Sequence, residues 1–473
     1  MNLSPKLEQI AVIGMGSTGI SIARHLQRMH IVCACFDEAN VVLPDDLQTT
    51  PLHTGPLDAD VLGGFDRVIV SPGIDWRHPA LLAVRGCGIP VHGDLDEFLR
   101  HYQGRIIAIT GTNGKTTTTQ MIALLLETLP GGCEAGGNIG TPMLDLLGHK
   151  PPAHVALELS SFQLERATQM HPHWAVLLNV QPDHADMHAS PQAYKEAKLS
   201  MFNKMILGDT ALFPIDVEWD ATVADLAGRG VNVTRFGVIE ADDERAKFCK
   251  AGVLLNTPWG DKASGKTDAL FWTQDSEWVK IDCDDLMLRG HHQQQNIAIA
   301  AQAAADHGVS RTVIEEAMLS FQGLEHRLEF VGHVAGRDWF NDSKATNPDA
   351  ALAALESFDE VVWICGGMRK KLDLDSLILM ARKKVSFALV IGKEPDAYSL
   401  MLDKADVPYM VSHTIEQAVK DAAEKTEGPV LLSPAAASQD QFKNYAERGK
   451  AFVAAIRALE PKDKKGYAGF SDD

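Results

Sequence analysis

The sequence predicts an α/β protein in which parallel sheets form three domains. Apolar stretches of about five residues alternate with amphipathic stretches of helical length, as in parallel sheets covered by helices. Glycine-rich turns follow strands in two of the predicted sheets. A chain of 473 residues is also too long for one hydrophobic core. We therefore expect domains at residues 1–103, 104–323 and 324–460, followed by a disordered polar tail at 461–473.

The bulk composition argues against several classes of function. The chain is 45% hydrophobic and 23% charged, as in globular proteins, and its formal net charge of −19 argues against nucleic-acid or anionic-membrane partners. Its 7 cysteines form no C-x-x-C pair. No apolar run approaches the about 18 residues of a membrane span, and the first residues hold no apolar signal core. We expect a cytoplasmic monomer with reduced thiols.

The first domain opens with a glycine-rich turn between a strand and a helix. The strand Ile10–Ile13 leads into Gly14-Met-Gly-Ser-Thr-Gly19, and a helix follows at Ile20–Met29. The next strand, Ile31–Phe36, ends in the acidic Asp37. This G-x-G-x-x-G pattern with a later acidic residue predicts a Rossmann-like domain. NAD is the obvious ligand, but the same loop serves any nucleotide diphosphate, so both interpretations stay open.

A second turn in this domain lies where ligands bind in α/β sheets. The strand Arg67–Val70 runs into Ser71-Pro72-Gly73, at the carboxyl end of the strand. Proline and glycine are also ordinary turn residues, so the segment alone does not separate a binding site from a simple turn.

The loop Gly111-Thr-Asn-Gly-Lys-Thr116 is the strongest single motif. It follows the apolar strand Ile106–Ile109 and opens a helix. Glycines let backbone N–H groups turn toward a phosphate, and the helix start adds partial positive charge. Lys115 would reach the terminal phosphates and the Thr116 hydroxyl a Mg²⁺ ion. The loop is shorter than the common phosphate loop, and we interpret it as the ATP site of a P-loop ATPase-like parallel sheet.

Three polar residues follow in the central domain. Glu158 ends the apolar strand His154–Leu159 beside the phosphate loop, where a Mg²⁺ carboxylate ligand belongs. His184 follows another apolar strand and suits a site, although it could simply cap its neighbours. Lys198 lies on a predicted helix, where a lysine is usually a solvated charge. Residues 239–275 have the composition of a surface insertion made of loops.

The last domain alternates strands and helices again and predicts a C-terminal Rossmann-like parallel sheet. The expected helices lie near 373–383, 395–403, 414–425 and 440–459. The expected strands are Val361–Cys365, Phe387–Ile391, Tyr409–Val411 and Val430–Leu432.

Five motifs in this order resemble those of the Mur ligases of peptidoglycan synthesis, and the resemblance covers about residues 8–458. The run from Glu158 to Glu165 is similar to the branch of the family that adds glutamate to UDP-N-acetylmuramoyl-L-alanine. The motifs are Gly111–Thr116, Gly137–Gly140, Glu158–Glu165, Asp342–Asn347 and Leu432–Ser438.

The resemblance implies a binding role for many residues. It places the UDP-sugar, rather than NAD, at Gly14, Gly16, Ser17, Thr18, Gly19, Asp37, Ser71, Pro72, Gly73, Asn138, Gln163 and His184. It places ATP at Gly111, Thr112, Asn113, Gly114, Lys115, Thr116, Thr117, Asn296, Arg327 and Asp342. It places glutamate at Thr346, Lys370, Ser438 and Tyr445.

The resemblance also implies the metal and catalytic residues. Thr116, Glu158, His184 and Lys198 would bind two Mg²⁺ ions, with Lys198 as an N-carboxylated lysine. Lys115, His184, Lys198 and Lys344 would be catalytic. The chain departs from the family pattern at Glu38, Gln293, Arg369, Lys371 and Tyr445.

The implied reaction is ATP-driven amide formation through an acyl phosphate, completed by domain closure. Three rivals remain. A folate polyglutamylating ligase shares the short phosphate loop, but that family lacks the first domain. A dehydrogenase would leave Lys115 and Glu158 without a purpose. A nucleotide-gated scaffold without enzymatic activity would not need Lys198, Lys344 and Ser438 together.

Overall fold

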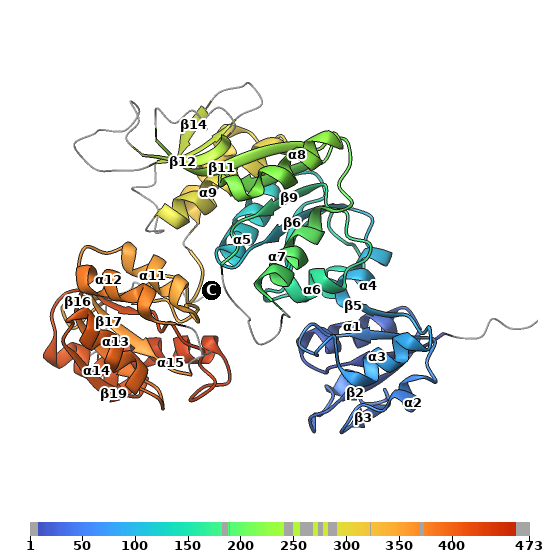
Figure 1. The fold of residues 1–473 in the computed structure, drawn as a ribbon, viewed down its shortest axis with the longest axis horizontal. Helices are drawn as coiled ribbons and strands as arrows, with labels where there is room; N and C mark the ends of the chain where they lie inside the picture. Colours follow the sequence, from blue (N-terminus) through green and yellow to red (C-terminus); the bar gives the residue numbers. More distant parts are fainter. Residues whose placement is uncertain are drawn as a thin grey trace, which may run out of the picture. The chain divides into compact units, whose positions relative to one another are not determined.

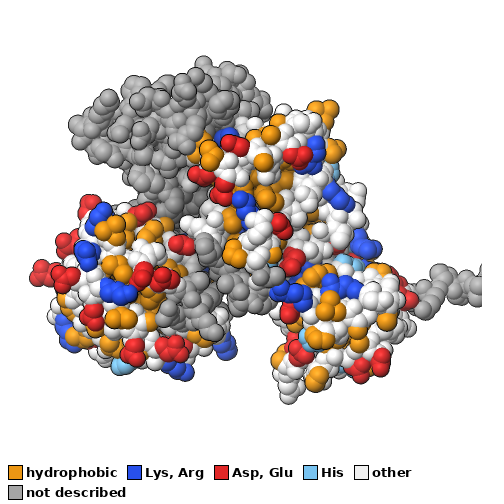
Figure 2. Space-filling model, in the orientation of Figure 1, with side chains coloured by type: hydrophobic (Ala, Val, Ile, Leu, Met, Phe, Trp, Pro, Cys, Tyr) orange, Lys and Arg blue, Asp and Glu red, His pale blue; other side chains and the backbone are white. Residues whose placement is uncertain are grey.

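The computed structural model describes residues 8–181, 188, 190–240, 249–255, 268–272, 278–281, 291–321, 323–368 and 373–459. These residues form three sheets, of five, nine and six strands (Figure 1). The first two sheets belong to one compact unit and the third to another. Figure 2 shows Asp and Glu side chains on the visible surface of both units, consistent with the net charge of −19. Within the described residues, no helix is long and apolar enough to cross a membrane.

The first sheet is parallel throughout, with strand order β3-β2-β1-β4-β5. The order reverses between β1 and β4, so the loops after these two strands diverge and leave room for a ligand. Its strands are β1 (Gln9–Ile13), β2 (Val32–Asp37), β3 (Leu52–Thr54), β4 (Arg67–Val70) and β5 (Val91–Gly93). Its helices are α1 (Ser17–Arg28), η1 (Asp45–Leu47), α2 (Ala59–Leu62), α3 (Pro79–Gly86) and α4 (Asp94–His101).

The second sheet has the order β14-β13-β12-β11-β10-β9-β6-β8-β7 and is parallel from β7 to β12. Its strands are β6 (Arg105–Thr110), β7 (Cys133–Gly137), β8 (His154–Glu158), β9 (Trp174–Leu177), β10 (Thr210–Pro214), β11 (Asn232–Glu240), β12 (Cys249–Leu255), β13 (Asp268–Trp272) and β14 (Trp278–Ile281). Its helices are α5 (Lys115–Leu126), η2 (Met143–Leu146), α6 (Ser161–Arg166), α7 (Pro191–Leu199), η3 (Ser200–Phe202), η4 (Val217–Trp219), α8 (Asp220–Gly228), α9 (His291–Asp306) and α10 (Arg311–Ser320).

The expectation of loops at residues 239–275 is wrong for two described segments. Strand β12 pairs parallel to β11, and β13 pairs antiparallel to β12, so both extend the central sheet. Neither segment is a continuous apolar run, since Lys250 and Gly252 interrupt β12 and Asp268 begins β13. Pairing with neighbouring strands therefore decided that they form.

A continuous hydrophobic core joins the first two sheets. Phe98 of α4 packs in one cluster with Met143 of η2 and Leu164 of α6. The Ser21 hydroxyl of α1 donates a 2.7 Å hydrogen bond to Asp145 across the same seam. The two sheets therefore hold their facing loops in a defined arrangement within the first unit.

The third sheet has the order β15-β16-β20-β17-β18-β19, with hydrophobic clusters on its two faces. The expected parallel sheet is confirmed from β16 to β19, but β15 and β16 pair antiparallel at one edge. Its strands are β15 (Glu329–Val334), β16 (Arg337–Asn341), β17 (Val361–Gly366), β18 (Val385–Ile391), β19 (Tyr409–His413) and β20 (Val430–Leu432). Its helices are α11 (Pro348–Glu356), α12 (Asp375–Lys384), α13 (Asp396–Ala405), α14 (Ile415–Lys425) and α15 (Tyr445–Arg457).

The last helix begins later than the expected residue 440. Asn444 adopts an extended backbone, and its side chain accepts a hydrogen bond from the Glu447 N–H, so it caps the helix that starts at Tyr445. The expected tail at 461–473 lies outside the described residues.

Candidate active site

The phosphate loop has the conformation that the sequence predicts. Strand β6 ends at Thr110, and Gly114 caps α5 with a left-handed backbone at φ +83°. A Cβ at Gly114 would lie 2.8 Å from the Asn296 side-chain oxygen, so a larger residue would be strained and crowded. Among the described residues no side chain caps α5, and its first N–H groups suit an anion.

Neighbouring side chains hold the loop in this conformation. The Asn179 side-chain oxygen accepts hydrogen bonds from the Thr112 and Asn113 N–H groups, at 2.9 and 2.8 Å. Lys115 folds back and donates to the Thr112 carbonyl oxygen at 2.7 Å. On the other side, Thr118 of α5 bonds the predicted Asn296 at 3.2 Å. Asn179 received no predicted role, although its place directly after a buried strand was a usable signal.

The acidic residue at the end of β8 lies beside the loop. The Thr116 hydroxyl donates to one carboxylate oxygen of Glu158 at 2.6 Å, and the Asn138 amide donates to the other at 3.0 Å. Glu158 is 3% exposed. A threonine hydroxyl and a carboxylate beside a phosphate loop are hard oxygen donors, so these residues fit a Mg²⁺ ion.

Lys198 is buried inside the site rather than solvated. It is 1% exposed, and its ammonium donates to the Gly111 carbonyl oxygen at 2.7 Å. It also lies 4.5 Å from the centre of the Tyr194 ring, whose hydroxyl is 3.1 Å from the Thr112 hydroxyl. The interpretation of Lys198 as a solvated helix charge is therefore wrong. The predicted His184 lies outside the described residues.

A pocket of about 390 Å³ opens where the first two sheets meet. The Ser71 hydroxyl donates to the Gly14 carbonyl oxygen at 2.7 Å, and Asp37 accepts from the Met15 N–H at 2.6 Å, which shapes its wall. Ten residues of the predicted UDP-sugar set line it together with Ile74 and Gly137. Those ten are Gly14, Gly16, Ser17, Thr18, Asp37, Ser71, Pro72, Gly73, Asn138 and Gln163.

Gly19, the last glycine of the predicted turn, does not line this pocket. A Cβ at this position would lie 1.9 Å from the Gly14 carbonyl oxygen, so the glycine allows α1 to pack closely on the turn. Gly16 caps α1 without a side-chain partner among the described residues, and the start of this helix therefore presents N–H groups at the pocket.

Asn138 connects the pocket with the phosphate loop. It lines the pocket, and it also donates to the carboxylate of Glu158, which in turn bonds Thr116. Asn138 and Glu158 thus form a hydrogen-bonded connection from the pocket to the phosphate loop.

Two buried residues that the sequence did not indicate support this pocket. Arg166 donates to the carbonyl oxygens of Ser71 and Pro72, at 2.7 and 3.0 Å, and to that of Ile74. Burial lowers the pKa of Arg166 to about 10. Asp94 accepts from the Gln163 amide at 2.8 Å, and burial raises its pKa. Their partners lie 69 to 95 positions away along the chain, beyond the reach of any local motif.

The third sheet gathers several of the remaining predicted residues. Asp342 accepts from the Ser433 hydroxyl at 2.8 Å, and burial raises its pKa to about 7. The Lys344 ammonium lies 3.8 Å from the centre of the Tyr445 ring. The buried Arg448 donates to the carbonyl oxygens of Ser343, Ala436 and Ala437, and so joins the two loops that carry Lys344 and Ser438.

Two further predicted residues of this unit lie in turns of the backbone. Arg327 and Thr346 are half-buried, and backbone N–H groups of both bond within their own turns. Lys370, with Arg369 and Lys371, lies outside the described residues.

Comparison with known proteins shows which protein family the chain belongs to. The description "Mur ligase MurD-like, N-terminal domain" matches residues 8–93, "Mur ligase middle domain" matches 109–304, and "Mur ligase, glutamate ligase domain" matches 326–436. The chain belongs to the Mur ligase family, whose members couple ATP to peptide ligation in peptidoglycan synthesis.

Individual relatives and solved structures show which members of the family the chain is similar to. The chain is 34% identical to "UDP-N-acetylmuramoylalanine--D-glutamate ligase" of Agrobacterium fabrum, over 96% of both chains. It is 37% identical to the protein of the same name from Frankia casuarinae, over 95% of this chain and 94% of the relative. Among solved structures, the UDP-N-acetylmuramate-alanine ligase MurC of Thermotoga maritima has a TM-score of 0.60 at 17% identity, covering 96% of this chain and all of that one, and so shares the fold. These matches favour the ligase over the dehydrogenase and scaffold alternatives.

Proposed function

We propose that the chain is an ATP-dependent ligase that joins D-glutamate to UDP-N-acetylmuramoyl-L-alanine. The names printed for its relatives at 34% and 37% identity support this assignment. The observation that carries it in this chain is the position of Asn138, which lines the pocket of the first sheet and bonds Glu158 beside the phosphate loop. A UDP-sugar and ATP bound at these two places would meet at that residue.

We propose a two-step reaction that uses this arrangement of the pocket and the phosphate loop. The start of α1 and Asp37 would hold the UDP, and Asn138 and Gln163 would direct the alanine carboxylate toward the phosphate loop. The carboxylate oxygen attacks the γ-phosphorus of ATP, the bond to the bridging oxygen breaks, and ADP leaves. The glutamate amine then attacks the acyl carbon, loses a proton, and displaces inorganic phosphate.

The main task of the chain is to bring anions together. Lys115 would bind the terminal phosphates of ATP and stabilise the negative charge that develops during transfer. Thr116 and Glu158 would hold a Mg²⁺ ion, which supplies further positive charge next to the transferred phosphoryl group. His184 and Lys198 would hold a second ion.

We propose that Lys198 carries an N-carboxyl group. The unprotonated amine attacks carbon dioxide, an N–C bond forms, a proton is lost, and an anionic carbamate results. The burial of Lys198 against the phosphate loop supports this, because an ammonium group there would repel the metal ions.

The loops of the third sheet would bind the amino acid and part of the nucleotide. We propose that Lys344 is catalytic and that its ammonium group would stabilise an anionic group of the reaction. Lys370 would pair with a carboxylate of glutamate. Hydroxyl groups for hydrogen bonds to the amino acid would come from Thr346, Ser438 and Tyr445. Arg327 and Asp342 would contact the nucleotide. We also propose that the three sheets correspond to domains at residues 1–103, 104–323 and 324–460, in a cytoplasmic monomer.

Phosphate release measures this function directly. Wild-type protein should release phosphate from ATP only with UDP-N-acetylmuramoyl-L-alanine and D-glutamate both present, and L-glutamate should replace D-glutamate poorly. Lys115→Ala should remove the activity, whereas Lys204→Ala, which changes an exposed lysine that bonds Gln169, should not. ATP hydrolysis that ignores both substrates would contradict the proposal.

A further inference from the structure

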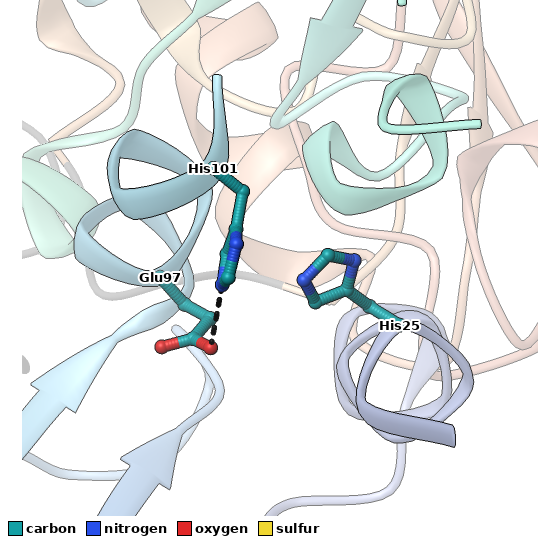
Figure 3. Close-up of side chains that lie close together, drawn as sticks. All are labelled: His25, Glu97 and His101. Atoms are coloured by element: carbon teal, nitrogen blue, oxygen red, sulfur yellow. Dashed lines mark ion pairs between the residues drawn. The ribbon is translucent and has the colours of Figure 1, made fainter. Parts of the chain in front are cut away.

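Two helices of the first sheet bring three metal-binding side chains together, away from the pocket described above. Glu97 and His101 lie one turn apart on the same face of α4, and His25 faces them from α1 (Figure 3). One ligand atom from each residue lies within 4.8 Å of the others. The rings of His25 and His101 have centroids 4.7 Å apart and meet edge to face.

His25 is a buried ring with no hydrogen-bond partner in the part of the chain that the structure describes. It is 2% exposed, and neither ring nitrogen has a partner among the described residues. A neutral imidazole has one donor and one acceptor, and burying both unpaired is costly and rare. A neutral imidazole offers the lone pair of one ring nitrogen to a metal ion.

Glu97 is charged and held in place. Burial opposes its ionisation, but hydrogen bonds from His92 and Arg67 lower the pKa of Glu97 to about 2. His92 lies 3.0 Å from one carboxylate oxygen of Glu97. The other oxygen lies 3.4 Å from the His101 ring nitrogen and also accepts from Arg67 at 3.3 Å. Partners behind a carboxylate orient it as a metal ligand.

The charges around the cluster are nearly balanced. Glu8 lies 2.7 Å from Arg67, which also contacts Glu97, and Arg100 lies 3.8 Å from Glu97. Two carboxylates thus face two guanidinium groups, and Arg28 of α1 adds a further positive charge near His25. Electrostatic attraction alone would therefore contribute little to the affinity of the cluster for a cation. The affinity for a metal ion must come from coordination by the imidazole nitrogens.

We propose that His25, Glu97 and His101 bind one divalent ion of the zinc type and thereby join α1 to α4. Two imidazole nitrogens and one carboxylate oxygen are a common zinc ligand set, whereas Mg²⁺ favours sites made mostly of oxygen ligands. The His101 side chain is 26% exposed, which provides an entry path and room for a water molecule as the fourth ligand. Bound zinc would satisfy a buried nitrogen of His25.

Zinc content of the untagged full-length protein tests the proposal. Chelator-treated protein is exposed to zinc sulfate in excess Mg²⁺, which occupies the two ion sites proposed beside the phosphate loop. The protein is then desalted and analysed for metal. Wild type should retain one zinc per chain, and His101→Ala should retain none. His171→Ala is the matched control, because His171 is a half-exposed histidine of the same unit that pairs with Asp209 at 2.8 Å. It should retain the zinc.

A second readout separates binding from folding. Zinc should raise the melting temperature of wild type and of His171→Ala but not of His101→Ala or His25→Gln. Cobalt(II) should produce the visible absorption of a four-coordinate ion only in the first two proteins. Equal zinc content in wild type and His101→Ala, or no zinc in wild type, would overturn the proposal, and His101→Ala decides the matter if His25→Gln does not fold.

Discussion

The guanidinium of Arg166, in the last turn of α6, donates a 2.7 Å hydrogen bond to the backbone oxygen of Ser71, in the loop after β4. The same side chain bonds the carbonyl oxygens of Pro72 and Ile74, and it is 3% exposed. Arg166, on a helix that packs on the second sheet, therefore holds the pocket wall formed by the loop after β4. This contact positions the proposed UDP-sugar site relative to the phosphate loop.

Arg166→Ala should weaken the UDP-sugar site selectively. It leaves three carbonyl oxygens and the buried Asp94 without their cation, so we expect a loss of about 3 kcal/mol in the free energy of unfolding. The KM for the UDP-sugar should rise while the KM for ATP stays unchanged. Arg229→Ala is the control, because Arg229 also bonds backbone oxygens in this unit but away from the pocket. A parallel rise in both KM values would contradict the positioning role.

Lys198→Ala should lower kcat by at least about a hundredfold, since it removes a charged group from the proposed reacting centre. Lys195→Ala changes a lysine of the same helix that pairs with Glu218 at 2.9 Å, and it should keep nearly full activity. Protein prepared with ¹³C-bicarbonate should show a carbamate carbon signal that is absent in Lys198→Ala. Full activity of wild type in buffer free of carbon dioxide would argue against N-carboxylation.

Glu158→Gln should raise the Mg²⁺ concentration needed for half-maximal activity by roughly ten- to a hundredfold. The substitution keeps the size of the side chain and removes the charge that would hold the ion. Activity titrated against Mg²⁺ at saturating ATP measures the effect, with the exposed Glu218→Gln as control. An unchanged Mg²⁺ dependence would place the ion elsewhere.

Asp342 should make the third sheet less stable as pH rises. Burial raises the pKa of Asp342 to about 7, above its ordinary value, so the folded state holds a proton that the unfolded state has lost. Its contribution to stability is complete below about pH 4 and disappears as pH rises through about 7.

Asp342→Asn removes this titration. Between pH 5 and pH 8, the stability of the variant relative to wild type should increase by on the order of 3 kcal/mol. Urea unfolding at both pH values measures this difference, with Asp375→Asn, an exposed aspartate that pairs with Lys404, as control. The same difference between variant and wild type at both pH values would show that Asp342 stays ionised.

Local patterns predicted much of the fold. The strands Arg67–Val70 and Val430–Leu432 have the predicted bounds, because a buried apolar run is a local signal. The antiparallel pair β15–β16 and the strands β12 and β13 escaped prediction. Their formation depends on neighbours that lie elsewhere in the chain.

The sequence by itself determined the phosphate loop and the glycine-rich turn after β1, because each needs only consecutive residues whose backbone the glycines permit. Only the tertiary structure decided that Lys198 is buried at the loop, that Asn138 joins the pocket to Glu158, and that Arg166 reaches Ser71. Burial and hydrogen-bond partners come from segments far apart in the chain, and no local pattern of residues records which segments the packed sheets bring together.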